Sequence, residues 1–395
     1  MSALLRSRRF WLIAFMLAAL LLRAPIVVLG PVLAPIMSTL SLSSSEASLL
    51  TTLVILCFGL LSPIAPTLAG RLGLDRALAI AMAAVALGGV LRGVAHYDIM
   101  LIGTLLVGFG IACANVFMPS VVKRDRPDRL GQTMGIYTMV MGVGATLASG
   151  LAVSTMELAG SWSAPIWLWA VIAVVPAALW GIRSTHADTR ASTTEATTIR
   201  AMMGSRVAWM LTLFLGVQSF SFYTFQTWLP TLATEGGVSH DMAGWMLATA
   251  NLISMPVSYL VARIAARCER HSALALTLTG LIGVALVGLM WSPSTLPLFW
   301  ALCLGAGQGG CFTLALTLIV LRSQSSADAS ALSGMSQSIG YLMAASGPLV
   351  FGAFKEATGD WNASLVMMMV LLGFQVVFGV LIGRPTKIQL RSRVR

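Results

Sequence analysis

The chain has 395 residues, of which 57% are hydrophobic and 10% charged, and its mean hydropathy is +0.87. Soluble domains carry about 25% charged residues, so this composition excludes a water-soluble globular protein and indicates lipid as the main solvent. The formal net charge of +11 would suggest nucleic acid in a soluble protein. Lysine is scarce and no basic run is interleaved with aromatic residues, so we expect no nucleic-acid partner.

Apolar segments long enough to cross a bilayer core of ~30 Å follow one another along the chain. They predict an all-α polytopic membrane protein with twelve transmembrane helices, near residues 10–37, 46–69, 77–96, 99–122, 132–156, 165–183, 207–233, 242–266, 273–291, 297–321, 331–354 and 364–383. The N-terminus MSALLRSRRF resembles a secretory signal, but Arg23 interrupts the apolar run that follows, so we predict an uncleaved first helix.

The basic residues predict the orientation of these helices, because cytoplasmic loops carry an excess of Lys and Arg. With the N-terminus in the cytoplasm, 22 of the 25 Lys and Arg residues fall in cytoplasmic loops or tails. Only Lys355 lies in an outer loop, whereas Arg23 and Arg92 lie within helices. A wrong number of spans would scatter this asymmetry, so we predict that both termini are cytoplasmic.

A long polar stretch between the sixth and seventh helices predicts the domain organisation. We expect a six-helix half at 1–183, a cytoplasmic linker at 184–206, and a second half with a cytoplasmic tail at 207–395. The halves also resemble each other: GFGIACANVFMPSVVKR (108–124) is echoed by GAGQGGCFTLALTLIVLR (305–322), with Cys113 and Cys311 separated by 198 positions. Such a parallel repeat is typical of transporters that work by alternating access.

Several motifs make the chain resemble the cyanate/2-nitroimidazole transporter group of the major facilitator superfamily. They are LRAPIVVLGPVLAPI in the first helix, MPSVVKRDRPD (118–128), FYTFQTWLPTL (222–232) and LSGMSQSIGYLMAASGP (332–348). The likeness runs over nearly the whole chain and implies that superfamily's fold of two pseudo-symmetric six-helix halves, in a bacterial inner membrane. It leaves the cargo open, because one named member is associated with cyanate and the other with export of 2-nitroimidazole. The loop GRLGLDRAL departs from the family pattern, retaining Asp75 and Arg76 but losing the trailing basic pair.

Arg23 is the first candidate for a substrate-binding residue. If the first helix begins near Phe10, Arg23 lies roughly 20 Å into the membrane, too deep to reach the interface. No acidic residue lies at comparable depth in the sequence, so an anionic or strongly dipolar solute is a suitable partner for the guanidinium group. The alternative is that Arg23 caps backbone carbonyls that nearby prolines leave without hydrogen bonds.

Five residues are candidates for gating. Pro25, Gly30 and Pro31 predict a kinked first helix, either as a gate or as ordinary proline enrichment in a membrane helix. The Asp75–Arg76 remnant is expected to latch helix ends in one conformation, as the resemblance implies. Arg92, one turn from the outer end of the third helix, is expected to reach the interface and to be structural.

Polar and aromatic residues within other helices are further candidates. The resemblance implies that helices one, four, seven and ten contribute most to a central cavity. For each residue, contacts between helices compete with substrate binding. The candidate substrate-binding residues besides Arg23 are Asn115, Tyr137, Gln218, Tyr223, Trp228, Gln308, Phe312, Gln337 and Tyr341.

These features together predict a secondary transporter, not an enzyme. The four histidines fall in loops or at helix ends, and the five cysteines lack zinc-ligand spacing, so we expect no cofactor and no metal. The expected solute is a cyanate-like anion, a small carboxylate or 2-nitroimidazole, carried by a monomer across the inner membrane. The alternatives are a broader-specificity exporter of drugs or metabolites with the same fold, or an anion channel.

Overall fold

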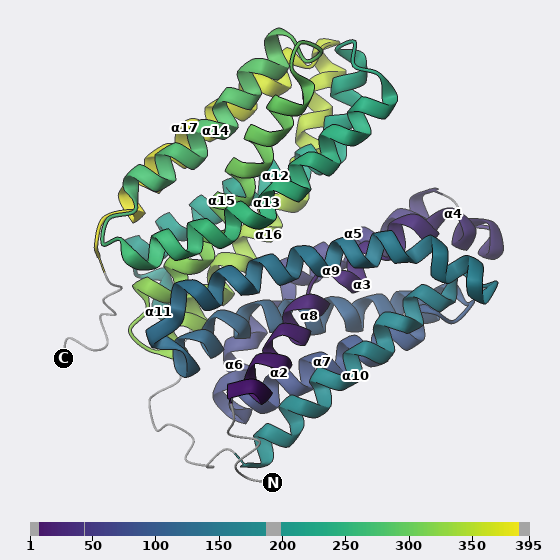
Figure 1. Cartoon of the computed structure of the whole chain (residues 1–395), viewed down its shortest axis with the longest axis vertical. Helices are drawn as coiled ribbons and strands as arrows, with labels where there is room; N and C mark the ends of the chain where they lie inside the picture. Colours follow the sequence, from purple (N-terminus) through teal and green to yellow (C-terminus); the bar gives the residue numbers. More distant parts are fainter. Residues whose placement is uncertain (1–7, 43, 187–198, 387–395) are drawn as a thin grey trace. The chain divides into compact units, whose positions relative to one another are not determined.

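The computed structural model describes residues 8–42, 44–186 and 199–386, and within these ranges it is almost entirely helical, without a strand (Figure 1). The all-α prediction is therefore confirmed. Residues 187–198, in the middle of the predicted linker 184–206, lie outside the described residues.

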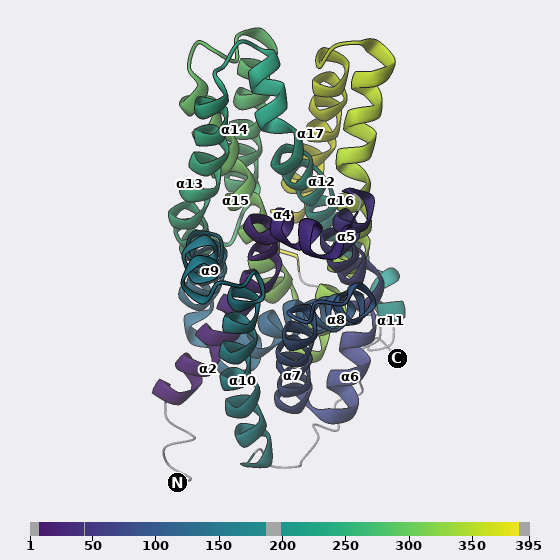
Figure 2. The same cartoon turned by 90° about the vertical axis from the view of Figure 1, so that its right-hand side faces the viewer.

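The chain forms two compact units. The first comprises Met1–Asp125, Val140–Ile199 and Ser326–Gly334. Its helices are α2 (Arg8–Leu21), α3 (Ala24–Val27), α4 (Leu29–Leu40), α5 (Ser44–Leu61), α6 (Ile64–Leu72), α7 (Leu74–Arg92), α8 (Tyr97–Asp125), α10 (Ser163–His186) and the later part of α9 (Leu130–Ala159). Within this unit α7 runs beside both α8 and α10 (Figure 2).

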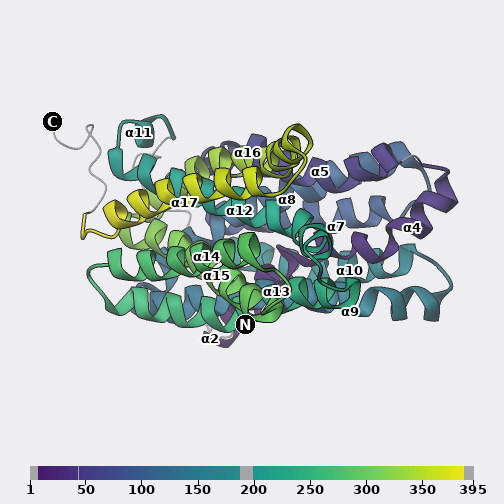
Figure 3. The same ribbon diagram turned by 90° about the horizontal axis from the view of Figure 1, so that it is seen from above.

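The second unit comprises Arg126–Met139, Arg200–Ser325 and Met335–Arg395. Its elements are η1 (Pro127–Arg129), the start of α9, most of α11 (Ile199–Met203), α12 (Arg206–Glu235), α13 (His240–Arg267), α14 (Ser272–Trp291), α15 (Pro297–Arg322), the later part of α16 (Ser326–Thr358) and α17 (Asn362–Ile382). Helix α14 lies between α15 and α17, as the views in Figures 1 and 3 show.

Ten helices in the described ranges are long and apolar enough to span a membrane, and the bent pair α5 and α6 makes an eleventh. Each of these spans corresponds to one of the twelve predicted segments. The remaining prediction, 331–354, lies inside α16, whose 33 residues begin with the polar stretch SADASALSGMSQS. This helix is long enough to cross a bilayer, but its first half is polar.

The predicted span 46–69 is bent by 63° between its two parts. Pro63 cannot donate a backbone hydrogen bond, which interrupts the helix at this point. The hydroxyl of the preceding Ser62 donates to the carbonyl of Phe58. The apolar run 46–69 predicts one continuous helix, and the bend corrects that prediction.

Glycines let the helices of each unit approach closely. A Cβ atom on Gly103 would lie 2.6 Å from the carbonyl oxygen of Gly88, so α7 and α8 cross in backbone contact. In the second unit, Gly309 of α15 is similarly close to Ser254 of α13, and Gly307 is close to Ile282 of α14. Small residues at such crossings replace the hydrophobic driving force that lipid does not supply.

The five cysteines are all free thiols. Four of them are buried within the helices and act as small packing residues, as the sequence predicted; these are Cys57, Cys113, Cys303 and Cys311. Cys268 differs because it is exposed, directly after the last residue of α13.

Candidate functional site

The first membrane span is broken twice. Helix α2 ends at Leu21, α3 covers only Ala24–Val27, and α4 begins at Leu29 (Figure 1). Arg23 is the residue before α3, with φ −123° and ψ −36°, and Pro25 stands in the first turn of α3. Proline is tolerated there because the first helical N–H groups have no partner within the helix. The kink predicted from Pro25, Gly30 and Pro31 is thus present, and Arg23 stands at the first break.

Arg23 itself is half-buried in the first unit. Its guanidinium group is the only basic group between Arg9 and Arg71 in the sequence. Asn115, the candidate on α8, is 5% exposed and lies in the same unit. Both side chains interact with neighbours in the structure, so a solute would have to compete with or complete those interactions.

Arg92 of α7 binds the short helix α3, which follows this break. Its Nη1 donates to the carbonyl oxygen of Pro25 at 2.6 Å, and its Nη2 lies 3.4 Å from the carbonyl oxygen of Leu50. The side chain is 1% exposed. The expectation that Arg92 reaches the interface was therefore wrong. Pairing with backbone carbonyls, the alternative considered for Arg23, is realised by Arg92, because the close crossing of α7 and α8 at Gly103 turns its side chain inward.

Two predicted residues of the second unit are joined directly. The amide nitrogen of Gln218 on α12 donates to the backbone carbonyl of Gln308 on α15, at 3.1 Å. The amide nitrogen of Gln308 donates in turn to the hydroxyl of Ser221, also at 3.1 Å, and Ser219 donates to the Gln218 carbonyl oxygen. These side chains are all buried. The result is a compact polar cluster between two helices, which fixes the orientation of both amide groups.

The aromatic candidates of the second unit fall into two groups. Tyr223 of α12 meets Tyr341 of α16 edge to face, with ring centroids 6.3 Å apart. Trp228 donates its indole N–H to the carbonyl of Pro348 at 2.8 Å and lies 5.4 Å from the ring of Trp361. Trp228 is thus integrated into packing between helices, the use weighed against substrate stacking above.

Three further candidates, Tyr137, Phe312 and Gln337, also belong to the second unit. Tyr137 and Gln337 are buried, and Phe312 is half-buried beside the buried Cys311 on α15. Each interacts with neighbouring residues. Gln226 and Asn251, which are polar residues within α12 and α13, pair with each other through their amide groups at 2.7 Å.

The gating candidate Asp75 belongs to an ion-pair cluster of the first unit. Its carboxylate lies 2.6 Å from Arg124 and 3.4 Å from Arg183. Asp125 pairs with the same two arginines, at 2.7 and 2.8 Å, and accepts a hydrogen bond from the indole N–H of Trp11. Two carboxylates and two guanidinium groups thus join α2, α7, α8 and α10. Arg76, the other gating candidate, is exposed beside this cluster.

Sequence reasoning missed a second cluster, in the second unit, at the start of α14. The ring of His271 lies 2.8 Å from the carbonyl oxygen of Ala265 through Nε2 and 3.2 Å from Arg322 Nη2 through Nδ1. Arginine only donates, so Nδ1 must accept and Nε2 must carry the proton. Burial, and then the charge of Arg322, lower the pKa of His271, although its hydrogen bond to Ala265 opposes them. The histidine is therefore a neutral structural link, recognisable in sequence only by its place before an apolar helix.

The ten to eleven apolar spans of the described residues, together with a broken first span and polar side chains held between helices, indicate a multi-pass α-helical membrane protein. The model of the Major Facilitator Superfamily matches residues 12–348, and the chain belongs to that family. The fold agrees with a solved structure of the transporter FucP in its outward conformation, with a TM-score of 0.71 over 95% of this chain and all of that chain at 13% identity.

Relatives of known sequence are similar over almost the entire chain. An uncharacterized transporter of Bacillus subtilis, YycB, is 36% identical over 93% of this chain and 92% of its own length. The 2-nitroimidazole transporter of Escherichia coli is 32% identical, over 98% and 99% of the two chains. The cyanate transport protein CynX of the same organism is 28% identical, over 89% and 91%. The resemblance noted from the motifs is confirmed.

Proposed function

We propose that this protein is a secondary transporter for a small, flat solute that carries a negative charge or a nitro group, and that it works by alternating access. Membership of the Major Facilitator Superfamily and the names of its relatives, which transport 2-nitroimidazole or cyanate, support this substrate class. The observation that carries the proposal is Arg23, half-buried at a break in an apolar span. A positively charged group at that depth is stabilised when a solute supplies the opposite charge.

The guanidinium group suits such a solute geometrically. Its planar fork of N–H donors matches two coplanar oxygens, as in a carboxylate or a nitro group, and it also attracts a linear anion. In the second unit, the cluster of Gln218, Gln308 and Ser221 offers oriented amides for the polar atoms of a heterocycle. Tyr223 and Tyr341 offer flat faces beside them.

The breaks in the first span are proposed as the moving part. A short segment such as α3, between two interruptions, can change its angle without breaking long runs of helical hydrogen bonds. Pro25, Gly30 and Pro31 supply those interruptions. Asp75, which is tied to Arg124, and the neighbouring Arg76 are proposed to stabilise one conformational state.

The proposed setting is a bacterial inner membrane, in which a monomer has both termini in the cytoplasm. The protein is a multi-pass membrane transporter with bacterial relatives. The distribution of Lys and Arg supports the orientation.

Counterflow in proteoliposomes tests the substrate, because exchange of labelled for unlabelled solute needs no driving ion. We expect uptake of labelled 2-nitroimidazole or cyanate against an internal pool of the same compound, with competition by small carboxylates. Arg23→Ala should lower the rate at least tenfold, and Arg23→Lys should recover only part of it because the fork is lost. Arg267→Ala, at an exposed position, is the matched control.

Normal counterflow by Arg23→Ala would contradict the proposed role of Arg23 in substrate binding. The proposed substrate class would still stand. A steady ohmic current in planar bilayers, without counterflow, would contradict alternating access altogether.

A further inference from the structure

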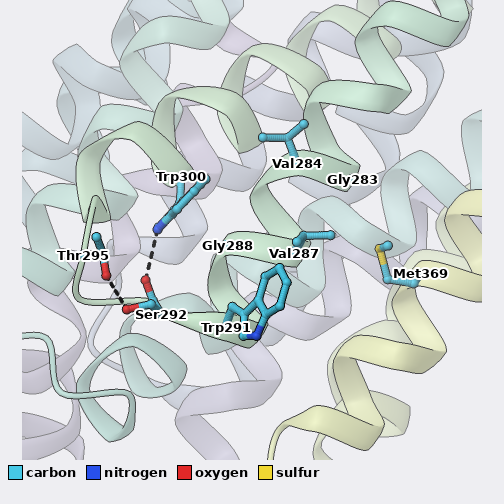
Figure 4. Close-up of a pocket in the computed structure, with 9 residues that line it drawn as sticks. All are labelled: Gly283, Val284, Val287, Gly288, Trp291, Ser292, Thr295, Trp300 and Met369. Atoms are coloured by element: carbon cyan, nitrogen blue, oxygen red, sulfur yellow. Dashed lines mark hydrogen bonds between the residues drawn. The ribbon is translucent and has the colours of Figure 1, made fainter.

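A pocket of about 460 Å³ lies in the second unit between α14, the start of α15 and α17 (Figure 4). Val287 and Trp291 of α14 form one side, Met369 of α17 lies across from them, and Trp300 of α15 closes the end. None of these residues belongs to the proposed transport site. We propose that this pocket binds one acyl chain of a membrane phospholipid.

Two glycines line the pocket and let side chains of α15 and α17 pack directly against α14. Gly288 packs directly against the ring of Trp300, so a larger residue there would collide with the indole. Gly283, one and a half turns earlier, faces Leu372 of α17, and a Cβ atom at this position would lie 3.3 Å from the leucine methyl group. With the neighbouring apolar side chains, the two glycines line the pocket as an apolar strip along α14.

Water is a poor occupant for this strip. A buried water molecule needs two to four polar partners. The polar groups at the end of the pocket already bind each other: the indole N–H of Trp300 donates to the carbonyl of Ser292 at 3.3 Å, and the hydroxyls of Ser292 and Thr295 form a hydrogen bond (Figure 4). The remaining lining consists of apolar side chains and glycines.

The pocket is continuous with the lipid-facing surface. Both α14 and α17 are apolar spans, and the valines beside the pocket are well exposed, with Val284 at 46% and Val370 at 56%. Hydrocarbon already covers these neighbouring residues in a membrane. If the strip stayed empty, its lining would lose dispersion contacts that an acyl chain restores, and this gain in packing favours a resident chain.

The residues at the rim of the pocket indicate whether it prefers a phospholipid with a charged headgroup. Trp291 ends α14 and is 87% exposed, as expected for an indole at the membrane interface. The following residues, SPSTLPLFW, contain no charge, so nothing at the rim selects an anionic lipid. The pocket should therefore take zwitterionic and anionic phospholipids equally well. With the predicted topology, the lipid belongs to the outer leaflet.

Photocrosslinking in proteoliposomes tests this proposal. The probe is phosphatidylcholine with a diazirine in one acyl chain, in vesicles of phosphatidylethanolamine and phosphatidylglycerol, and mass spectrometry locates the adducts. We expect adducts on the peptides that contain Val287, Trp300 and Met369, at several times the yield found on Val171 and Val174, which are exposed on α10. A phosphatidylglycerol probe should give the same yield within twofold.

Gly283→Leu, which fills the pocket, should lower the yield there at least fivefold and leave the α10 adducts unchanged. Gly280→Leu, on an exposed turn of the same helix with open space around it, is the matched control and should stay within twofold. Should Gly283→Leu fail to fold, Val284→Phe with Leu276→Phe as its control makes the same comparison.

Pocket adducts at or below the α10 yield, or insensitive to both filling variants, would overturn the proposal. A lower yield of pocket adducts in the presence of 2-nitroimidazole would also overturn the proposal, because the pocket would then belong to the transport site. Loss of counterflow in Arg23→Ala with normal pocket labelling leaves the lipid site standing, since the two sites share no residue.

Discussion

Two arginines meet the broken first span in different ways. Arg23 precedes α3 at the first break, whereas Arg92, far along the chain, donates to the carbonyl of Pro25 inside α3. Arg92 thereby fixes the segment to which Arg23 belongs. A buried guanidinium that donates to a backbone carbonyl of α3 is a positioning group, and its removal takes this hydrogen bond away from the carbonyl of Pro25.

Arg92→Met should loosen α3. Losing a buried hydrogen bond from a charged donor costs about 1.5–3 kcal/mol, so amide hydrogen exchange in the peptide covering residues 22–30 should accelerate about tenfold or more. Arg92→Lys should restore part of the protection, because one ammonium group reaches fewer carbonyls than the guanidinium fork. Transport by Arg92→Met should show a raised KM, since the solute binds a less ordered Arg23.

Arg267→Met, which replaces an exposed arginine, is the control variant and should leave exchange in residues 22–30 unchanged. Hydrogen exchange in α14 serves as an internal standard. Unchanged exchange in residues 22–30 of Arg92→Met would show that other contacts hold α3. Faster exchange with an unchanged KM would separate the stability of α3 from substrate binding.

The sequence predicted that Arg23 is placed in an apolar span beside prolines, because both facts are local. It did not predict the partner of Arg92, which lies 67 positions away in the chain. Depth along a helix can be read from sequence, but the face that a side chain presents depends on how α7 and α8 cross. Here the crossing at Gly88 and Gly103 turned Arg92 inward instead of toward the interface.

Elements at the ends of the helices show a related pattern in the two units. Arg124 and Arg322 are separated by 198 positions, the same offset as Cys113 and Cys311. Each arginine ends a span and binds a residue near the start of another, but Arg124 binds the carboxylate of Asp75 whereas Arg322 binds the neutral ring of His271. Arg322 also donates to the carbonyl of Ile382, and the backbone N–H of His271 donates to Gly383. The second link therefore ties the start of α14 to α15 and the end of α17.

This difference predicts a pH dependence of stability in the second unit. Because the pKa of His271 is lowered in the folded protein, the unfolded chain binds its proton more readily. The stabilisation is complete above the unfolded value of about 6.5 and is lost as the pH falls toward the folded pKa, by up to about 1.4 kcal/mol per pH unit. Melting temperatures of the detergent-solubilised protein between pH 8 and pH 5 measure it.

His271→Asn, which cannot titrate, should flatten this dependence, while His96→Asn at an exposed turn should leave it unchanged. A variant His271→Asn with the full acid sensitivity of the parent would contradict the assignment.

Element boundaries followed from sequence where an apolar run has clear ends, as at Ser272–Trp291. The predicted boundaries were wrong where an apolar run is interrupted by a residue that bends the helix. Ser62 and Pro63 lie within an apolar segment of normal length, so the 63° bend between α5 and α6 left no mark in a hydropathy pattern. The opposite difficulty applies to α16, a single long helix whose polar first half does not look like a membrane span.

At the scale of the whole molecule, the predicted topology was constrained by charge alone. The distribution of Lys and Arg predicts that every even-numbered loop is cytoplasmic, including the turn between α13 and α14. That turn carries Cys268, the exposed thiol, while the four other cysteines are buried. The natural chain therefore contains its own reporter of sidedness.

A maleimide that cannot cross membranes should react with one site per chain, without any cysteine having been removed or added. In intact cells we expect Cys268 to stay unlabelled, and in inside-out vesicles we expect it to react, with Cys268→Ser as the blank. Labelling of Cys268 from outside intact cells would show that every helix has the opposite orientation to the predicted one. The same thiol would also accept a fluorophore beside His271, so that a single dye could follow this end of the bundle during turnover.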